Sequence, residues 1–496
     1  MKKVLVLLTV ILLYNGSYGQ MEDNIWHFGR DGAGLDFSNC DPVVITNGAL
    51  GDQWEGVASM CNRTTGQLLF YTDGQGAFNS NNVYMPNAQV GLWQTITQNI
   101  IIPQPGNDSI YYIILPEPQS DCALRNSYHL GMTYAIINMN LDSGLGDVVS
   151  FFNPLIDSGN CEKITAIRNA NGQDIWLIGH RYRNDSFFVF NVTPLGIDTV
   201  PTYYNIGPVI RSNENTSYGT SCFDAIGELK PSPNGKKIAF TTYLSGITAL
   251  FDFNDSTGVI SNPINLSISP YGGYGVSFSP DNSKLYFGCN DTTQLLGAPN
   301  GYLFQFDISS GNQTTIQNSR SLIYHIDSVS YGSLKLGPNG KIYATLDDGY
   351  NTRGSQYLEV INNPDSSGLA CNYAHHGVSL NGFYSGWGLN NIMERGNYCN
   401  STGISSPNQT PRQISLYPNP TSTTFTLSYH LQNSQLSILN SQFKLLDISG
   451  RIVYSKIITG TTGREIIDAS ALSDGMYFYQ LTSASESWKG KVVIQR

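Results

Sequence analysis

The chain has 496 residues, of which 13% are charged, and 27 basic against 37 acidic side chains give a formal net charge of -10. An average soluble protein carries about 25% charged residues, so a weakly charged chain rich in Gly, Asn, Ser, Thr and Tyr is typical of an extracellular all-β protein. The acidic balance excludes the basic surface on which nucleic-acid binding depends. A chain of this length can form two or three domains.

The N-terminus predicts a signal peptide over residues 1–19. Lys2 and Lys3 precede an apolar run from Val4 to Tyr14, and small or polar residues follow as far as Gly19. A membrane-spanning helix needs about 20 apolar residues, so cleavage after Gly19 is favoured over an uncleaved anchor. The mature chain is therefore expected outside the cytoplasm.

The cysteines carry no metal signature, because none forms a CxxC pair or lies beside a histidine at ligand spacing. No metal or cofactor is predicted. In an exported chain an even number of cysteines suits disulfides; pairing in chain order would join Cys371 to Cys399, and the alternative is several buried, unpaired thiols. The eight cysteines are Cys40, Cys61, Cys122, Cys161, Cys222, Cys289, Cys371 and Cys399.

Three copies of one hairpin recur in the middle of the chain, each with two alternating strands around a Pro-Asn/Asp-Gly type of turn. They are GELKPSPNGKKIAF from Gly227, GVSFSPDNSKLYF from Gly275 and GSLKLGPNGKIYA from Gly332. Weaker copies occupy residues 56–71, 99–114 and 163–179. Their spacing suits four-stranded propeller blades of roughly 40 to 50 residues with some longer loops.

The two ends of this region predict how the ring closes. Residues 25–37 match the second and third strands of a unit, whereas Gly386 to Met393 match a lone first strand. Joined, they make one more blade. The expected fold is therefore all-β, a seven-bladed β-propeller over residues 20–400 closed by N- and C-terminal strands, with six or eight blades as alternatives.

Glycines precede the innermost strands of several units, where a side chain would clash with its neighbours near the axis. Gly56, Gly227 and Gly388 hold this place, and tyrosine precedes the glycine in Tyr274-Gly275 and Tyr331-Gly332. These residues, together with Trp387, are interpreted as packing residues.

The stretches NIWHFGRDGAGLDF, GQLLFYTDG, EKITAIRNANGQDIWLIGH, GVSFSPDNSKLYF and KLGPNGKIYATLDDG resemble the propeller region common in large secreted proteins of Gram-negative bacteria that use type IX secretion. The resemblance covers most of residues 24–395. It implies a fold, and no defined activity or catalytic residue.

A Ser-, Thr-, Pro- and Asn-rich linker over residues 401–413 separates the propeller from a second domain over 414–496. The second domain has about seven short strands, the pattern of a small Ig-like β-sandwich. It resembles the type A sorting domain of type IX secretion cargo through a set of motifs in the same order. Their residues are Tyr417, Pro418, Asn419, Pro420, Gly450, Arg451, Gly475, Tyr477, Lys489 and Lys491.

The sorting-domain resemblance implies that the tail is read by the outer-membrane translocon and its sorting machinery, and is then often removed. It also implies that the cargo is released, or attached to surface lipopolysaccharide on the outer membrane. The alternative is an ordinary Ig-like adhesive module that stays on the mature chain.

The propeller lacks the sequence motifs of zinc proteases, serine hydrolases and P-loop enzymes, and it has no complete EF-hand. The adjacent His375 and His376 could be ligands or acid–base groups. Neighbouring side chains point to opposite sides of a strand, so a loop role is favoured.

Function is expected on the loops of one propeller face, of which the longest are residues 116–131, 201–226 and 346–356. Aromatic rings flanked by Asn, Asp and Arg can stack on sugars and bond to hydroxyl groups, which favours binding of a glycan, surface polymer or protein. The alternatives are a polysaccharide hydrolase or lyase with carboxylates at the propeller channel, and a purely structural surface component. The candidate binding residues are Arg125, His129, Tyr203, Tyr204, Tyr218, Asp224, Asp347, Asp348, Tyr350 and Arg353.

Overall fold

The computed structural model divides into two compact units, Met1–Asn400 and Ser401–Arg496. It describes residues 21–51, 53, 55–91, 97–117, 131–157, 159–211, 222–292, 299–347, 354–393, 398–399, 414–417, 421–430, 441–458, 462–482 and 487–496. The predicted signal peptide and linker lie outside these residues and stay predictions. Among the described residues, no helix is both long and apolar enough to span a membrane.

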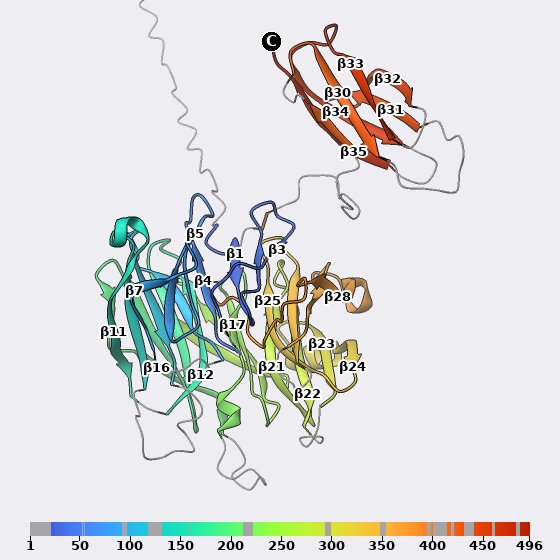
Figure 1. Cartoon of the computed structure of the whole chain (residues 1–496). Coiled ribbons are helices and arrows are strands. Elements are labelled where there is room, and N and C mark those ends of the chain that lie inside the picture. Colours follow the sequence, from blue (N-terminus) through green and yellow to red (C-terminus); the bar gives the residue numbers. More distant parts are fainter. Residues whose placement is uncertain are drawn as a thin grey trace, which may run out of the picture. The chain divides into compact units, whose positions relative to one another are not determined.

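The described part of the first unit contains seven antiparallel sheets, which are the blades of a propeller (Figure 1). The N-terminal blade has three strands, β1 (Ile25–His27), β2 (Gly34–Asp36) and β3 (Val43–Ile45). The next two blades contain β4 (Ala58–Cys61), β5 (Leu68–Thr72), β6 (Gly76–Asn79) and β7 (Tyr84–Gln89), then β8 (Ile100–Pro103), β9 (Ile110–Leu115), β10 (Met132–Asn138) and β11 (Asp147–Ile156).

The fourth and fifth blades contain β12 (Asn160–Arg168), β13 (Ile175–Arg181), β14 (Asn184–Thr193), β15 (Gly196–Ile197) and β16 (Thr202–Ile210), then β17 (Leu229–Pro231), β18 (Lys237–Thr241), β19 (Thr248–Asn254) and β20 (Val259–Asn265). The last two contain β21 (Tyr271–Phe278), β22 (Lys284–Asp291), β23 (Gly301–Asp307) and β24 (Ser321–Ile326), then β25 (Ser330–Leu336), β26 (Ile342–Asp347), β27 (Tyr357–Ile361) and β28 (Tyr373–Ser379). Short helical turns are η2 (Asp142–Gly144), η3 (Phe223–Ala225), α1 (Gln313–Asn318) and η5 (Gly368–Cys371).

The six predicted hairpins are confirmed as the first two strands of the six later blades, from β4–β5 to β25–β26. The loop predicted over residues 201–226 is wrong in its first part, because β16 pairs with β14 there. Its exposed and half-buried residues alternate at the edge of the blade, and such a polar edge strand resembles a loop in sequence.

The hydrophobic core lies between neighbouring blades, because alternation gives each sheet two apolar faces. One cluster joins Trp26 and Leu35 of the first blade to Tyr343 and Leu358 of the last. The ring centroids of Trp26 and Tyr343 are 5.7 Å apart, and in Figure 1 the blue β1 and the yellow β25 lie in the same part of the ring. The ring therefore closes between its first and last blades.

The predicted lone strand at residues 386–393 is not a regular strand, although it lies where the prediction placed it. It is held by isolated parallel bridges from Asn390 to Val57 and from Ile392 to Ile101. The side-chain oxygen of Asn390 accepts a hydrogen bond from the backbone amide of Ser59 at 2.5 Å. Its side-chain nitrogen donates a hydrogen bond to Asp23 Oδ1 at 2.6 Å. Side-chain amides thus replace the backbone ladder that a full strand would form.

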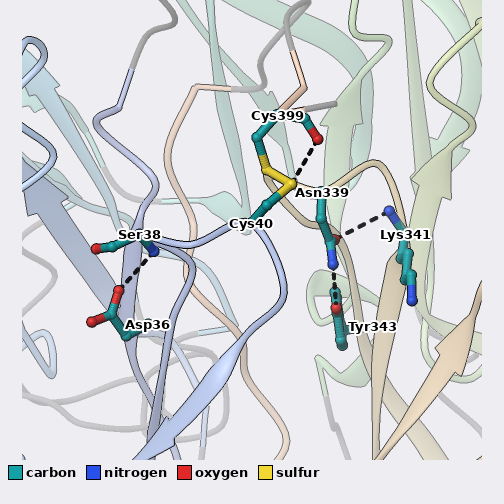
Figure 2. Close-up of a disulfide and its surroundings, with 7 residues drawn as sticks. All are labelled: Asp36, Ser38, Cys40, Asn339, Lys341, Tyr343 and Cys399. Carbon is teal, nitrogen blue, oxygen red and sulfur yellow. Dashed lines mark hydrogen bonds between the residues drawn. A yellow bond between two sulfur atoms is a disulfide. The ribbon is translucent and has the colours of Figure 1, made fainter. Parts of the chain in front are cut away.

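A disulfide between Cys40 and Cys399 ties the N-terminal blade to the end of the propeller, with Cα atoms 5.7 Å apart. The expected pairing of Cys371 with Cys399 is wrong, because Cys371 is a buried thiol in the core beneath β25 and β26. Figure 2 shows the disulfide beside the turn of the last blade, where Asn339 Nδ2 donates to Tyr343 Oη at 2.9 Å. Cys222 is also disulfide-bonded, whereas Cys161 and Cys289 are buried thiols.

The second unit is a β-sandwich whose described strands number seven, as predicted. One sheet has the order β29 (Ile414–Tyr417), β30 (Thr424–His430), β33 (Thr462–Asp468). The other has the order β32 (Ile452–Ile458), β31 (Ser441–Leu446), β34 (Gly475–Thr482), β35 (Ser487–Ile494). Its core is apolar and includes Phe425, Phe443, Ile467 and Val492.

Candidate ligand site at the propeller axis

Polar side chains connect the first strands of different blades at the propeller axis. Gln98 Oε1 accepts a hydrogen bond from the Ile164 amide at 3.2 Å and another from the Leu229 amide at 2.8 Å. The three residues belong to three blades. One side-chain amide therefore satisfies backbone groups that no ladder partner reaches.

Glu228 makes the same kind of connection on the other side of the axis. Its carboxylate accepts from Ser333 Oγ at 2.6 Å and from the Val276 amide at 3.2 Å, and it lies 3.3 Å from Lys230 Nζ. Both Glu228 and Lys230 are 2% exposed. Lys230 Nζ also donates to Asn391 Oδ1 at 3.5 Å. We call Gln98, Glu162, Glu228, Lys230, Asn390 and Asn391 the axial network.

Two glycines show how closely the strands approach at this point. A Cβ atom on Gly275 would lie 2.3 Å from the Gly332 carbonyl oxygen, and one on Gly388 would lie 2.2 Å from that of Glu55. The predicted crowding near the axis is therefore confirmed at these positions.

At one end of the axis, aromatic rings gather around Trp387. Its ring centroid lies 5.9 Å from that of Tyr243 and 5.2 Å from that of Tyr274, and its indole N–H donates to Asp347 Oδ2 at 2.5 Å. Tyr243 and Trp387 keep part of their surface open, whereas Tyr274 and Asp347 are buried. With Glu55, these four residues form what we call the mouth cluster.

Glu55 is the titratable group of the mouth cluster with the clearest functional signature. Burial and the nearby carboxylate of Glu162 together raise the pKa of its carboxyl to about 8, while the neighbouring Tyr274 side chain acts in the opposite direction. Glu162 is itself held by Thr97, whose amide and hydroxyl donate to its Oε2 at 2.8 and 2.7 Å. Part of Glu55 is exposed, but its carboxyl is buried, so the protonated form predominates at neutral pH. Such perturbed groups are concentrated at functional sites.

A buried lysine holds the loop next to the mouth cluster. Lys163 Nζ donates to the carbonyl oxygens of Asp224 and Ala225 at 3.1 and 2.9 Å, and burial lowers its pKa to about 8. Asp224 in turn accepts hydrogen bonds at Oδ1 from the amides of Leu244 and Ser245. These contacts position the turn that carries Tyr243.

The predicted binding residues do not form one site among the described residues. Asp224 and Asp347 are buried near the axis, whereas Tyr203 and Tyr204 lie on β16, the outermost strand of its blade. Tyr203 is 49% exposed, and Tyr204 packs partly against the core beneath. The other candidates, Arg125, His129, Tyr218, Asp348, Tyr350 and Arg353, lie outside the described residues.

The sequence interpretation missed Glu55 and Tyr243 and treated Trp387 as packing. A signal was present, because Glu55, Tyr274 and Trp387 each directly precede the glycine of a unit. The structure brings these three residues together. Tyr331 has the same place in its unit, but its hydroxyl bonds to that of Tyr373 within the last blade, so this sequence rule alone does not select the site.

The residues predicted to form the sorting motifs lie partly in turns and at strand ends and partly within strands of the second unit. Gly450 and Arg451 form the turn after β31, where the Arg451 amide donates to Asp447 Oδ1 at 3.0 Å. Tyr477 is buried and its hydroxyl donates to the Ser473 carbonyl at 2.9 Å. Tyr417 ends β29, Gly475 begins β34, and Lys489 and Lys491 lie on β35. Pro418, Asn419 and Pro420 lie outside the described residues.

Comparison with solved structures finds propellers. A protein described as a candidate 6-phosphogluconolactonase from Bacteroides uniformis shares 12% identity, with a TM-score of 0.39 over 83% of this chain and 98% of that one. The Swd1 propeller domain of Myceliophteria thermophila shares 10% identity, with a TM-score of 0.39 over 68% and 96%. The periplasmic gluconolactonase of Pseudomonas aeruginosa shares 10%, with a TM-score of 0.35 over 90% and 99%. None of these likenesses bears on activity.

No curated protein matches the chain. Residues 415–495 match the family described as the secretion system C-terminal sorting domain. This domain indicates export, with secretion or attachment at the cell surface, and interaction with the type IX secretion machinery. The chain is thus a β-propeller protein that carries a type IX secretion sorting domain at its C-terminus.

Proposed function

We propose that the propeller binds a glycan or surface polymer at the mouth cluster after export as type IX secretion cargo. The observation that carries this proposal is the grouping of partly exposed Glu55, Tyr243 and Trp387 around buried Tyr274 and Asp347. Aromatic faces stack on the apolar faces of sugar rings, and neighbouring polar groups bond to hydroxyls.

The protonation state of Glu55 suits an uncharged, hydroxyl-rich ligand. With a pKa of about 8, its carboxyl is mostly neutral at pH 7 and can both donate and accept a hydrogen bond. Above pH 8 the donor is lost. Ligand affinity should therefore fall as the pH rises through this range.

The binding test uses the full secreted chain on a glycan array, followed by calorimetry with the best ligand. Trp387→Ala and Tyr243→Ala should each weaken binding at least tenfold, because each removes one stacking face. Tyr203→Ala is the matched control, since it removes an exposed tyrosine from the edge of a blade. Equal losses in all three variants, or none at the mouth cluster, would contradict the proposal. Thermal melting separates lost binding from lost folding.

The export route has its own test. Removal of residues 414–496 should leave the propeller in the periplasm, and mass spectrometry of the exported chain should show cleavage after Gly19. The same spectrum reports whether the tail has been removed and whether a surface lipopolysaccharide is attached. Export of a variant from which residues 414–496 were deleted before synthesis would contradict the proposed role of the tail.

A second candidate function is polysaccharide hydrolysis or elimination at the same place. It is favoured by the electrostatic interaction between Glu55 and Glu162, because two neighbouring carboxyls in different environments can divide acid and base roles. Turnover of a polysaccharide that is abolished by Glu55→Gln would support it. If the chain binds a polysaccharide but does not cleave it, the binding function is favoured over the enzymatic one.

A further inference from the structure

A bulge in the last blade places two histidines opposite one glutamate. In the β27–β28 pair, Leu358 lies opposite Val378 and Val360 lies opposite Ala374. Glu359 alone therefore faces the three residues 375–377. His376 has a φ of 55°, a left-handed conformation that turns the chain within the bulge.

The bulge overturns the expectation that His375 and His376 point to opposite sides. Their ring centroids are 3.8 Å apart with an interplanar angle of 29°, so both imidazoles lie on one side of the strand. Both residues belong to β28 rather than to a loop. Both are exposed, whereas Glu359 is 1% exposed.

The three side chains have the spacing of a metal site. His375 Nδ1 lies 2.9 Å from Glu359 Oε2, and one ligand atom from each of the three residues lies within 4.8 Å of the others. The rings are nearly parallel, so binding requires one imidazole to turn. His376 is stacked between His375 at 3.8 Å and Tyr357 at 4.3 Å, and its exposed ring must leave this stack in order to turn.

The carboxylate is oriented by groups that are not themselves ligands. The Tyr373 hydroxyl donates to Glu359 Oε2, and the His376 amide donates to Oε1 at 3.1 Å. Such bonds fix a ligating carboxylate before a metal arrives. A buried, oriented carboxylate beneath two accessible imidazoles forms a site that opens to solvent.

We propose that Glu359, His375 and His376 bind a divalent first-row transition metal ion at the rim of the last blade. Imidazole nitrogens with one carboxylate oxygen suit Zn²⁺, Cu²⁺ or Ni²⁺, whereas Ca²⁺ and Mg²⁺ favour oxygen ligands. Three protein ligands leave a coordination position for water or an external group. The site is independent of the mouth cluster, and it differs from the sequence expectation that no metal is bound.

The test is titration of the tag-free, EDTA-dialysed full chain with ZnCl₂ by calorimetry, supported by the nitrogen hyperfine pattern of bound Cu²⁺. The wild type should bind one ion per chain at this site. The double variant His375→Ala/His376→Ala should lose at least about a hundredfold in affinity, and Tyr373→Phe about tenfold.

His325→Ala is the matched control, because His325 is an exposed histidine 3.4 Å from Asp327 on the neighbouring blade. It should leave zinc affinity unchanged. The proposal is overturned if the wild type binds no ion, in which case the three residues form only the hydrogen bond between His375 and Glu359, or if the double variant binds as tightly as the wild type. Far-UV circular dichroism of the variants shows that they are folded.

Discussion

The propeller and the sorting domain are both all-β, yet they are held together differently. The axis of the propeller buries charged residues, including Asp23, Glu228, Lys230 and Lys335, whereas Thr421 is the single buried polar side chain in the described part of the sandwich. Two facing sheets can close on apolar contacts alone. First strands that meet around an axis have backbone groups without ladder partners, so side chains must satisfy them.

The contrast implies that the propeller depends on directional polar contacts, and the sandwich on apolar area. A buried charge that loses its partner is costly because it remains without solvent, whereas an exposed pair is worth little. Stability of the propeller should therefore respond more strongly to single polar substitutions and to pH.

The largest effect is expected for Glu228→Gln, which leaves Lys230 without its charged partner at 3.3 Å. The free energy of unfolding of the propeller should fall by about 3–5 kcal/mol, measured by guanidinium denaturation of the full chain. The control Asp252→Asn breaks the solvent-facing pair with Lys237 in the same blade and should cost at most about 1 kcal/mol. Equal effects of the two variants would mean that the axial network is not a stabilising connection.

The next effect concerns the covalent part of ring closure. Cys40 and Cys399 are separated by 359 residues, so replacing both with serine releases a long loop in the unfolded chain. The propeller should lose about 2–4 kcal/mol in the same denaturation experiment, and the sandwich transition should not move. Ser38→Ala, on the same loop, is the control because the hydrogen bond from Ser38 to Asp36 is donated by the backbone amide, which the substitution keeps. A disulfide variant as stable as the wild type would show that blade packing alone closes the ring.

The blades could be predicted from the sequence because their signals are local. Each hairpin carries its own turn residues and alternation, and the sandwich strands are equally regular. The sequence predicts where the ring closes but not which contacts close it, because Asn390 bonds through its side chain to residues far away in sequence. The pairing of Cys40 with Cys399 is non-local in the same way.

The candidate sites were harder to predict than the blades, for two physical reasons. In the sequence, Glu55 has the features of an ordinary loop residue. Only the folded ring brings Tyr274 and Trp387, which are distant in sequence, close to it. His375 and His376 were assigned to opposite sides because regular strands alternate, and nothing in the sequence marks the bulge that reverses this at Glu359. In both cases the missing information is tertiary geometry rather than residue type.

A smaller effect is expected from pH, because two propeller histidines are buried. Burial lowers the pKa of His180 to about 3 and that of His27 to about 4. The folded propeller therefore excludes protons that the unfolded chain binds, and stability falls as the pH drops below about 6.5 toward those values. Each histidine should cost about 2 kcal/mol by pH 5.

Glu55 acts in the opposite direction, since its raised pKa of about 8 means that stability is lost as the pH rises from about 4.5 toward 8. The contribution of the histidines is therefore isolated by comparing how steeply the free energy of unfolding changes with pH in different variants. His180→Phe should lose less stability than the wild type between pH 7 and pH 5, whereas His325→Ala on the surface should keep the wild-type slope. Parallel slopes in all three proteins would show that His180 does not cause the acid sensitivity.

The smallest effect is expected in the sandwich. Lys456 and Glu465 pair at 2.6 Å across strands with side chains 38% and 30% exposed, so Glu465→Gln should change the sandwich transition by less than about 1 kcal/mol. High salt should remove even that difference, because an accessible pair is screened. A cost comparable with that of Glu228→Gln would mean that the sandwich also depends on charge pairing, and the contrast between the two units would then lie in their architecture alone.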